Sequence, residues 1–480
     1  PPRSTLFPYT TLFRSSLLLM CQLNGQIDTL KESSVVAYRT VSVPQQKLSG
    51  ESLKLLSTET VADALKYFAG VQVKDYGGLG GQKTINVRSL GNHHVGVFID
   101  GIRVTNVQNG TVDLGKYSIS NMESVELYNA NKVSPLMSAS EFASGSTIYL
   151  NSLRPTKTSL VTTYKLGSFS THRLGIAVSY KTFVHFDSEY CTSKGNYPYK
   201  FKSQYEDTTG VRKNSDIVFF RGDLSFFYKN LKAHIYHYSS ERGLPGGVVR
   251  RLSDKYTDVG REWDRNSFIQ LIYQNSVNSH SLKANAKYEY DYLHYRSDYP
   301  ENISVHCNNV YKQQDIYASL VYTYNYKYGY LSSSSDLRWT DLVCDVKNFS
   351  YVYRLDSKSS LFGTFKFHNL DVSSNLLYTL VTDRTKGSAS PLSKFTGSIH
   401  SSYKLSKFSI RCFYKQIFRA PTLNDLYYTM VGNRRLRPVN SNSNKCIINL
   451  NNVTWSISKF KPIYFSKPLI SKCISIPIIN

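Results

Sequence analysis

Residues 71–113, VQVKDYGGLGGQKTINVRSLGNHHVGVFIDGIRVTNVQNGTVD, decide the fold that we predict for this chain. Two short runs rich in β-branched residues, at 83–88 and 95–99, surround a polar loop, and the second run ends in Asp100-Gly101. An Asp-Gly pair after an apolar strand favours a two-residue hairpin, because both central positions of a type I′ turn need a positive φ. The sequence therefore predicts a small glycine-rich β unit in which Asp100 and Gly101 form a structural turn.

The composition of the 480 residues excludes two broad classes of protein. Hydrophobic residues make up 41% and charged residues 19%, which fits neither a helical membrane protein nor a disordered chain. No run approaches the ~18 apolar residues that a transmembrane helix needs. The chain has 38 Tyr against 24 Phe and 3 Trp. Such an excess of tyrosine is typical of a β-barrel with aromatic girdles at the lipid–water boundary.

The formal net charge of +24 raises the possibility of nucleic-acid binding. The basic residues are scattered and form no compact stripe, so we expect no nucleic-acid partner. We also expect no catalytic site, cofactor or metal. The glycines at 77–81 lack the Lys-Ser/Thr ending of a phosphate loop, and no GxSxG or HExxH motif occurs. His93 and His94, if they lie on a strand, point to opposite faces, which argues against chelation by both.

Three further segments of the N-terminal region have clear periodicity. Residues 57–68, STETVADALKYF, predict a helix that Ser57 or Thr58 caps and that Gly70 ends. Residues 121–129 and 146–151 predict strands.

From about residue 156 the sequence changes to repeated alternating strands. Strands are predicted near 159–166, 173–181, 216–229 and 231–239, and again in the later runs around 282–290 and 316–327. In the last run Ile316, Leu320 and Tyr322 share one face, whereas Ser319 and Thr323 lie on the other. Period two puts one set on lipid and the other on a polar lumen. A soluble β-sandwich also alternates, but the β pattern continues to about residue 440 without a second domain boundary.

Both ends of the sequence look foreign to the rest. Residues 1–15 include TLFPYTTLFRS, which resembles a translated sequencing adapter, and we expect residues 16–26 to be the remnant of a signal peptide. Residues 441–480 contain no Asp, Glu, Gly, Ala or Arg, so we expect a shifted reading frame there.

Several segments, in this order along the chain, carry a resemblance to a known family. They are Ile85–Arg88, Val97–Arg103, Met122–Tyr128, Ser240–Gly246 and Phe418–Tyr427. The pattern resembles the TonB-dependent outer-membrane transporters, and is most similar to their cobalamin-type branch. The sequence departs from the family at Ser89, where glycine is usual, and at 130–143, where the glycine-rich passage is altered.

The resemblance implies a mainly β fold, with an N-terminal α+β plug domain at 46–155 inside a transmembrane antiparallel β-barrel of the 22-stranded class. Residues 156–440 would form about 14 strands of such a barrel, which is therefore incomplete in this chain. Arg88, Asp100 and Gly101 belong to the plug signature. The region 27–45 would hold the TonB box, a strand that pairs with the energising partner. The box residues would be Glu32, Ser33, Ser34, Val35, Val36, Ala37 and Tyr38.

By the same resemblance, plug loops at 76–82, 91–94 and 105–109 would face an extracellular ligand. The candidate ligand-binding residues are Tyr76, Gln82, His94, Asn106, Gln108 and Asn109. Glycine lets the backbone approach a ligand closely, and neutral amides suit a large ligand with a polar rim.

The expected function is TonB-dependent uptake of a scarce large ligand, a cobalamin or other corrinoid, across the bacterial outer membrane. The expected partners are the TonB energy-transducing complex, outer-membrane lipid and, in some such systems, a surface lipoprotein. One alternative is an iron-siderophore importer of the same fold. Another is a secreted β-rich binding or adhesion protein, and a third is a nucleic-acid binder.

Overall fold

A computed structural model describes most of the chain. The described residues are 46–463 and 471–474, apart from gaps at 57, 89–90, 129–131, 203–206, 246–259, 299–305, 347–348, 350, 406–407, 429–431 and 451–452. The sequence-predicted adapter, signal-peptide remnant and TonB box, Glu32–Tyr38, therefore lie outside the described residues.

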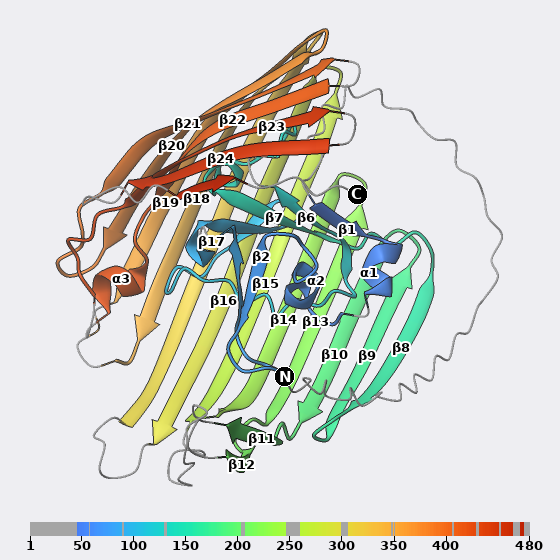
Figure 1. Ribbon diagram of the computed structural model, residues 1–480, viewed down its shortest axis with the longest axis vertical. Helices are drawn as coiled ribbons and strands as arrows, with labels where there is room; N and C mark the ends of the chain where they lie inside the picture. Colours follow the sequence, from blue (N-terminus) through green and yellow to red (C-terminus); the bar gives the residue numbers. More distant parts are fainter. Residues whose placement is uncertain are drawn as a thin grey trace, which may run out of the picture.

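The N-terminal domain is a small α+β unit that lies against the concave side of a large sheet (Figure 1). Its helices are α1 (Glu51–Leu55), α2 (Val61–Leu65) and the 3₁₀ turns η1 (Asn92–His94) and η2 (Ala139–Phe142). Its strands are β1 (Gln46–Ser49), β2 (Val71–Asp75), β3 (Lys83–Val87), β4 (Val95–Ile99), β5 (Ile102–Val104), β6 (Met122–Tyr128) and β7 (Ser146–Ser152). Five strands form one sheet in the order β1-β6-β7-β4-β5, and β2 pairs with β3 separately.

The predicted Asp-Gly hairpin is confirmed. Ile99 of β4 pairs with Ile102 of β5, and the two residues between them have φ values of 53° (Asp100) and 85° (Gly101). Both values are positive, as a type I′ turn requires. β4 is buried along its whole length and also pairs in parallel with β7, so the hairpin joins the sheet through β4, and β5 is the edge strand.

The predicted helix forms, but it is shorter and begins later than expected. α2 starts at Val61 because Thr60, rather than Ser57 or Thr58, is its N-cap and accepts a hydrogen bond from the Asp63 backbone N–H. The Thr60 hydroxyl donates in turn to the Asp63 carboxylate at 2.6 Å. Gly70 follows with a φ of 74°, a left-handed conformation suited to ending a helical segment.

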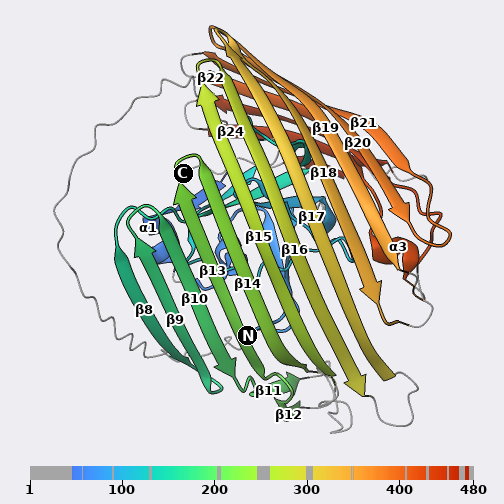
Figure 2. The ribbon, with the colours of Figure 1, turned by 180° about the vertical axis from the view of Figure 1, so that it is seen from behind.

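The rest of the described chain forms one large antiparallel sheet, seen from behind in Figure 2. Its strands are β8 (Ser159–Gly167), β9 (Thr171–Tyr180), β10 (Val184–Ser193), β13 (Ile217–Tyr228), β14 (Leu231–Leu244), β15 (Gly260–Val277), β16 (His280–Asp298), β17 (His306–Tyr326), β18 (Gly329–Cys344), β19 (Val352–Phe367), β20 (Leu370–Arg384), β21 (Leu392–Leu405), β22 (Phe408–Arg419), β23 (Val439–Leu450), β24 (Val453–Ile463) and β25 (Ser471–Ile474). The 16 strands follow chain order across the sheet. A hairpin of β11 (Tyr197–Lys202) and β12 (Asp207–Arg212) and a short helix, α3 (Leu423–Tyr427), lie in two of the connections.

The predicted two-faced strands are confirmed in this sheet. On β17, Ile316 and Leu320 are 50% and 54% exposed on the convex face, whereas Ser319 and Thr323 are 6% and 0% exposed. The second set faces the N-terminal domain, whose core is continuous with Ile217, Phe219 and Tyr236 of the sheet, among others. The alternation therefore separates an outer apolar surface from a polar lumen.

The two ends of the large sheet differ in their connections. On one side, the connections β9–β10, β13–β14, β15–β16, β17–β18, β19–β20 and β21–β22 are two or three residues long. We call this side the turn end. On the opposite side, which we call the loop end, the connections include 194–216, 245–259, 345–351 and 420–438. Bacterial outer-membrane barrels have short turns on the periplasmic side and long loops outside.

Two further observations concern the membrane and the tail. Among the described residues, no helix is both long and apolar enough to cross a membrane. β23 pairs with β22 and β24 with β23, so the sheet continues beyond residue 440. The shifted reading frame inferred from the composition of 441–480 stays a prediction, which sequencing of the source DNA would test.

Candidate functional site

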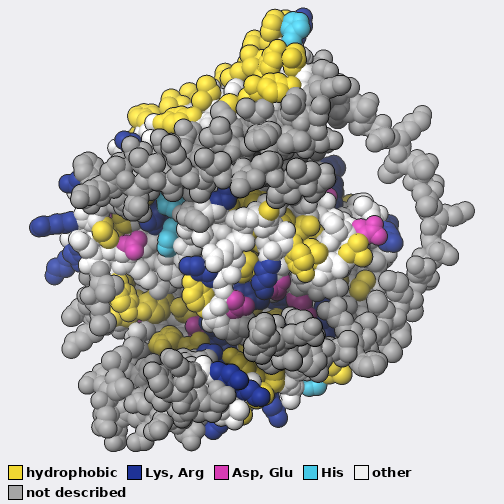
Figure 3. Space-filling view, in the orientation of Figure 1, with side chains coloured by type: hydrophobic (Ala, Val, Ile, Leu, Met, Phe, Trp, Pro, Cys, Tyr) yellow, Lys and Arg dark blue, Asp and Glu magenta, His cyan; other side chains and the backbone are white. Residues whose placement is uncertain are grey.

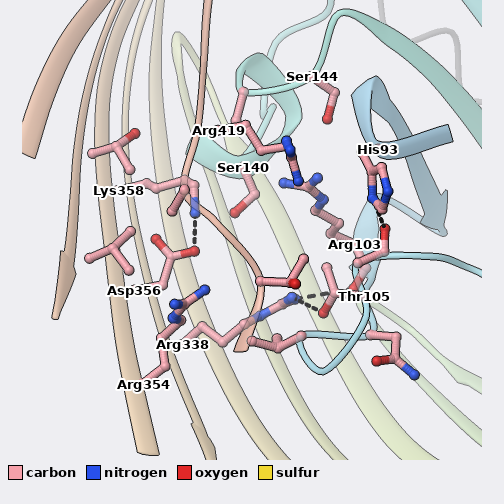
Figure 4. A pocket seen from close by; sticks show the side chains of 18 of the residues that line it. His93, Arg103, Thr105, Ser140, Ser144, Arg338, Arg354, Asp356, Lys358 and Arg419 are labelled. Atoms are coloured by element: carbon pink, nitrogen blue, oxygen red, sulfur yellow. Dashed lines mark hydrogen bonds and ion pairs between the residues drawn. The ribbon is translucent and has the colours of Figure 1, made fainter. Parts of the chain in front are cut away.

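A cavity of about 150 Å³ opens between the N-terminal domain and the loop end of the large sheet. Five cationic side chains and two carboxylates line it, together with two histidines, so we call it the basic cavity (Figure 4). The charged and histidine residues are His93, His94, Arg103, Arg338, Arg354, Lys358, Arg419, Asp336 and Asp356. Cations exceed anions here, so the cavity favours an anionic ligand.

The sheet strands hold their cations in place by ion pairs. Arg354 of β19 forms a bidentate ion pair with Asp383, in which Nε and Nη2 lie 2.6 and 2.8 Å from the carboxylate oxygens. Its Nη1 donates to the Pro421 carbonyl at 2.8 Å. Lys358, four residues along the same strand, pairs with Asp356. Bidentate arginine–carboxylate pairs hold both side chains in a defined geometry, so this wall of the cavity is preorganised.

Arg103 is the cation that the N-terminal domain contributes from β5. Arg338 of β18 donates to the Arg103 carbonyl at 3.1 Å and to the Thr105 hydroxyl. Burial, and the positive charge of Arg338, lower the pKa of the Arg103 guanidinium to about 10, so it remains charged at neutral pH. An anion bound beside Arg103 would offset the repulsion from Arg338.

The two histidines are not on a strand, which corrects the prediction about their faces. They belong to the 3₁₀ turn η1, just before β4, and both line the basic cavity. Nδ1 of the His93 ring lies 3.3 Å from the Gly110 carbonyl oxygen. Burial and the charge of Arg419 lower the pKa of His94 to about 4, so this ring is neutral at pH 7.

The lowered pKa of His94 predicts a pH-dependent stability. The unfolded chain takes up this proton near pH 6.5 and the folded chain only near pH 4, so stability should fall as the pH drops between these values. His94→Gln should make this pH dependence of the unfolding free energy shallower. The change is at most about 1.4 kcal/mol per pH unit, which is the slope that uptake of one proton produces. Urea unfolding at several pH values measures it, with exposed His172→Gln as the control. An unchanged slope in His94→Gln would contradict the prediction.

A second cavity, of about 160 Å³, lies beside the first at the loop end. Its lining mixes neutral amides, carboxylates and tyrosines, and we call it the mixed cavity. The lining residues that matter here are Gln82, Asn106, Gln108, Asn109, Asp113, Lys116, Asp264 and Asp291. Lys116 pairs with Asp264 at 2.6 Å; burial alone would lower the pKa of its ammonium group, but Asp264, Asp113 and Asp291 together raise it.

Plug-side loop 105–112 separates the two cavities, and Asn106 lines both. The backbone N–H groups of Leu423 and Asn424, at the start of α3, donate to the carbonyls of Val107 and Gln108 at 3.1 and 2.9 Å. A connection of the large sheet is thus hydrogen-bonded along the backbone to this loop. A ligand that moves the 420–427 segment would therefore act directly on the N-terminal domain.

The structure brings most of the sequence-predicted ligand-binding residues to these cavities. Gln82, Gln108 and Asn109 line the mixed cavity, Asn106 lines both, and His94 lines the basic cavity. Tyr76 lines neither and is 60% exposed. Whether any of these side chains contacts a ligand stays a prediction.

The remaining signature residues have structural contacts. Asp100 accepts hydrogen bonds from the Ser152 backbone N–H (3.0 Å) and hydroxyl (2.9 Å), and pairs with Lys232 of β14 at 2.8 Å. Gly101 supplies the turn, and Arg88 has a φ of 50° where β3 ends. None of the three lines either cavity.

The cations of the large sheet are the site residues that sequence reasoning missed. Arg354, Asp356 and Lys358 alternate along β19 with outward residues such as Leu355, which is 39% exposed. Charged residues at every second position of a barrel strand mark its lumen face. This alternation can be read from the sequence, but it does not show which strands face one another across the lumen.

Comparison with known proteins agrees with this architecture. Residues 38–143 match the family model of the TonB-dependent receptor plug domain. The N-terminal domain of this chain is therefore a plug domain, and the chain combines it with a large antiparallel sheet of the kind found in TonB-dependent receptor barrels.

Solved structures share the fold at low sequence identity. The siderophore receptor PirA from Acinetobacter baumannii aligns with 87% of this chain and 70% of its own, at 13% identity and a TM-score of 0.61. The FrpB iron transporter from Neisseria meningitidis aligns with 88% and 72%, at 10% identity and a TM-score of 0.67. FpvA from P. aeruginosa, bound to a pyoverdine, aligns with 87% and 63%, at 12% identity and a TM-score of 0.61. This chain thus spans about 63–72% of the lengths of these three proteins.

Proposed function

We propose that this chain forms the plug and part of the barrel of a TonB-dependent transporter that takes up a large anionic metal chelate across the bacterial outer membrane. The observation that carries this proposal is the basic cavity. It lies at the loop end, where plug and sheet meet, and five cations of the two domains line it. Three of the similar structures are of a siderophore receptor, an iron transporter and a pyoverdine complex, which supports the same class of ligand.

The geometry supports a two-step action. An anionic ligand would first bind between Arg103 of the plug and the cations of β18 and β19, where little charge reorganisation is needed. The TonB complex would then pair with the box at 32–38 by strand addition and pull on the plug. The backbone hydrogen bonds between 107–108 and 423–424 connect the occupied site to the part that moves.

Uptake of a corrinoid is a second candidate, and the mixed cavity favours it. The neutral amides of Gln82, Asn106, Gln108 and Asn109 gather there. A corrinoid has an amide rim without strong negative charge, and amide side chains both donate and accept hydrogen bonds.

Uptake measurements test the proposal and separate the candidates. Cells carrying the gene should accumulate an iron-labelled anionic chelate, and deletion of 32–38 should abolish accumulation while binding of the chelate persists. Accumulation of labelled cobalamin in place of the chelate would favour the corrinoid. Binding without accumulation in both forms of the protein would favour a secreted or surface adhesin and contradict transport.

A further inference from the structure

An aromatic–lysine pair recurs at the turn end of the large sheet. At three of the hairpin turns an exposed lysine is the direct neighbour of an exposed tyrosine. The pairs are Tyr180-Lys181, Tyr228-Lys229 and Lys327-Tyr328. We call these three lysines and their neighbouring rings the turn-end belt.

In each pair the ammonium group lies close to the neighbouring ring. The ammonium groups of Lys181 and Lys229 lie 5.3 Å from the ring centres of Tyr180 and Tyr228, and Lys327 lies 5.4 Å from that of Tyr328. These three rings are exposed, with 45–60% of their surface accessible. At the top of Figure 3 apolar side chains lie along the rim of the sheet, with basic and histidine side chains at its tip.

The backbone does not dictate lysine at these turns. Lys181 and Lys229 have φ values of 48° and 49°, a left-handed conformation for which glycine or asparagine is the usual choice. The presence of lysine at such a position therefore favours a role for its side chain.

The belt also differs in charge from the loop end. The connecting residues at 181–183, 229–230, 278–279, 327–328 and 368–369 contain no Asp or Glu. At the loop end, in contrast, arginines are paired: Arg261 lies 2.7 Å from Glu241, and Arg242 lies 2.7 Å from Glu262. Part of the net charge of +24 is thus concentrated, without compensating carboxylates in the turns, on the side that the short connections mark as periplasmic.

We infer that the turn-end belt binds the headgroups of anionic phospholipids in the periplasmic leaflet of the outer membrane. The tyrosine rings would lie at the interface, and each lysine would extend from the ring toward a lipid phosphate. A lysine next to an anionic membrane surface strengthens binding about fivefold. The inference rests on the outer-membrane location in the proposed function, but on none of the cavity residues.

A lipid titration tests the inference on the full chain in a neutral detergent. Short-chain phosphatidylglycerol, phosphatidylcholine and inorganic phosphate are the probes. We expect preference for phosphatidylglycerol, and at least a tenfold loss of that binding when the lysines at 181, 229 and 327 are changed to glutamine. The same three changed to arginine should keep it.

A matched variant at the loop end serves as the control. Glutamine at Lys194, Lys200 and Lys386 removes the same charge from exposed sites at the other end and should change binding less than twofold. Equal losses in both sets, or equal affinity for the two lipids, would overturn the inference. So would binding of inorganic phosphate as strong as that of phosphatidylglycerol, which would indicate a small-anion site. Chelate binding measured on the same samples shows separately whether the proposed function stands.

Discussion

Replacement of Arg103 by methionine is expected to weaken the binding of an anionic chelate by about 10- to 100-fold, the effect of losing one charge-assisted hydrogen bond. The folded chain should be no less stable, because Arg103 is half-buried beside Arg338 and its own charge is disfavoured there. Methionine keeps most of the side-chain volume and removes the charge. Affinity and stability should therefore change independently in this variant.

Arg354→Met is the informative comparison for Arg103→Met. Arg354 also lines the basic cavity, but it is paired at 2.6 and 2.8 Å with Asp383. Its loss would leave a buried carboxylate without its main partner, which typically costs about 3–5 kcal/mol. Chelate binding followed by calorimetry, with urea unfolding on the same samples, separates the two effects. A large loss of stability in Arg103→Met, or full chelate affinity in it, would contradict the assigned role.

Local sequence signals were sufficient for the parts of the fold that depend on neighbours in the chain. The Asp100-Gly101 turn was predictable because only a few residue types accept two consecutive positive φ values. The faces of β17 were predictable because alternation with period two requires no knowledge of other strands. The start of α2 was not predictable, because Ser57, Thr58 and Thr60 can all cap a helix. The hydrogen bond between Thr60 and Asp63 decides between them.

The basic cavity could not be predicted from the sequence, for a different reason. Arg103 and Arg338 come together although 235 positions separate them, and that contact depends on how the plug is seated in the sheet. The prediction of neutral plug amides at the site was made from the plug loops alone. The strands of the large sheet add the positive charge, and for this reason the ligand that we propose is anionic rather than neutral.

Ion pairs also attach the plug to the sheet. Asp100 pairs with Lys232, and Lys116 with Asp264. A third group centres on Arg221 of β13, which is 2% exposed. A force that pulled the plug away from the sheet would have to break these contacts, so they would contribute to the resistance.

Arg221→Met is expected to loosen the plug more than any other single change considered for these contacts. Arg221 holds Glu189 at 2.5 Å and also donates to the plug carbonyls of Glu59 (3.2 Å) and Lys116 (3.4 Å). Methionine removes both bonds to the plug and leaves Glu189 with Arg173 alone, so the loss should be about 3–5 kcal/mol. Arg221→Lys keeps the charge but not the planar guanidinium group, so it should lose less stability than Arg221→Met.

Unfolding in urea and proteolysis of the plug measure this loosening. Arg261→Met is a matched control, because Arg261 also contacts two carboxylates, Asp216 and Glu241, but in an exposed setting. Exposed ion pairs contribute only about 0–1 kcal/mol, so the control should unfold almost as the parent chain does. If Arg221→Met unfolds and is cleaved no faster than Arg261→Met, the buried pair does not hold the plug, and the resistance to pulling must come from the hydrogen bonds between 107–108 and 423–424 and from the apolar contacts instead.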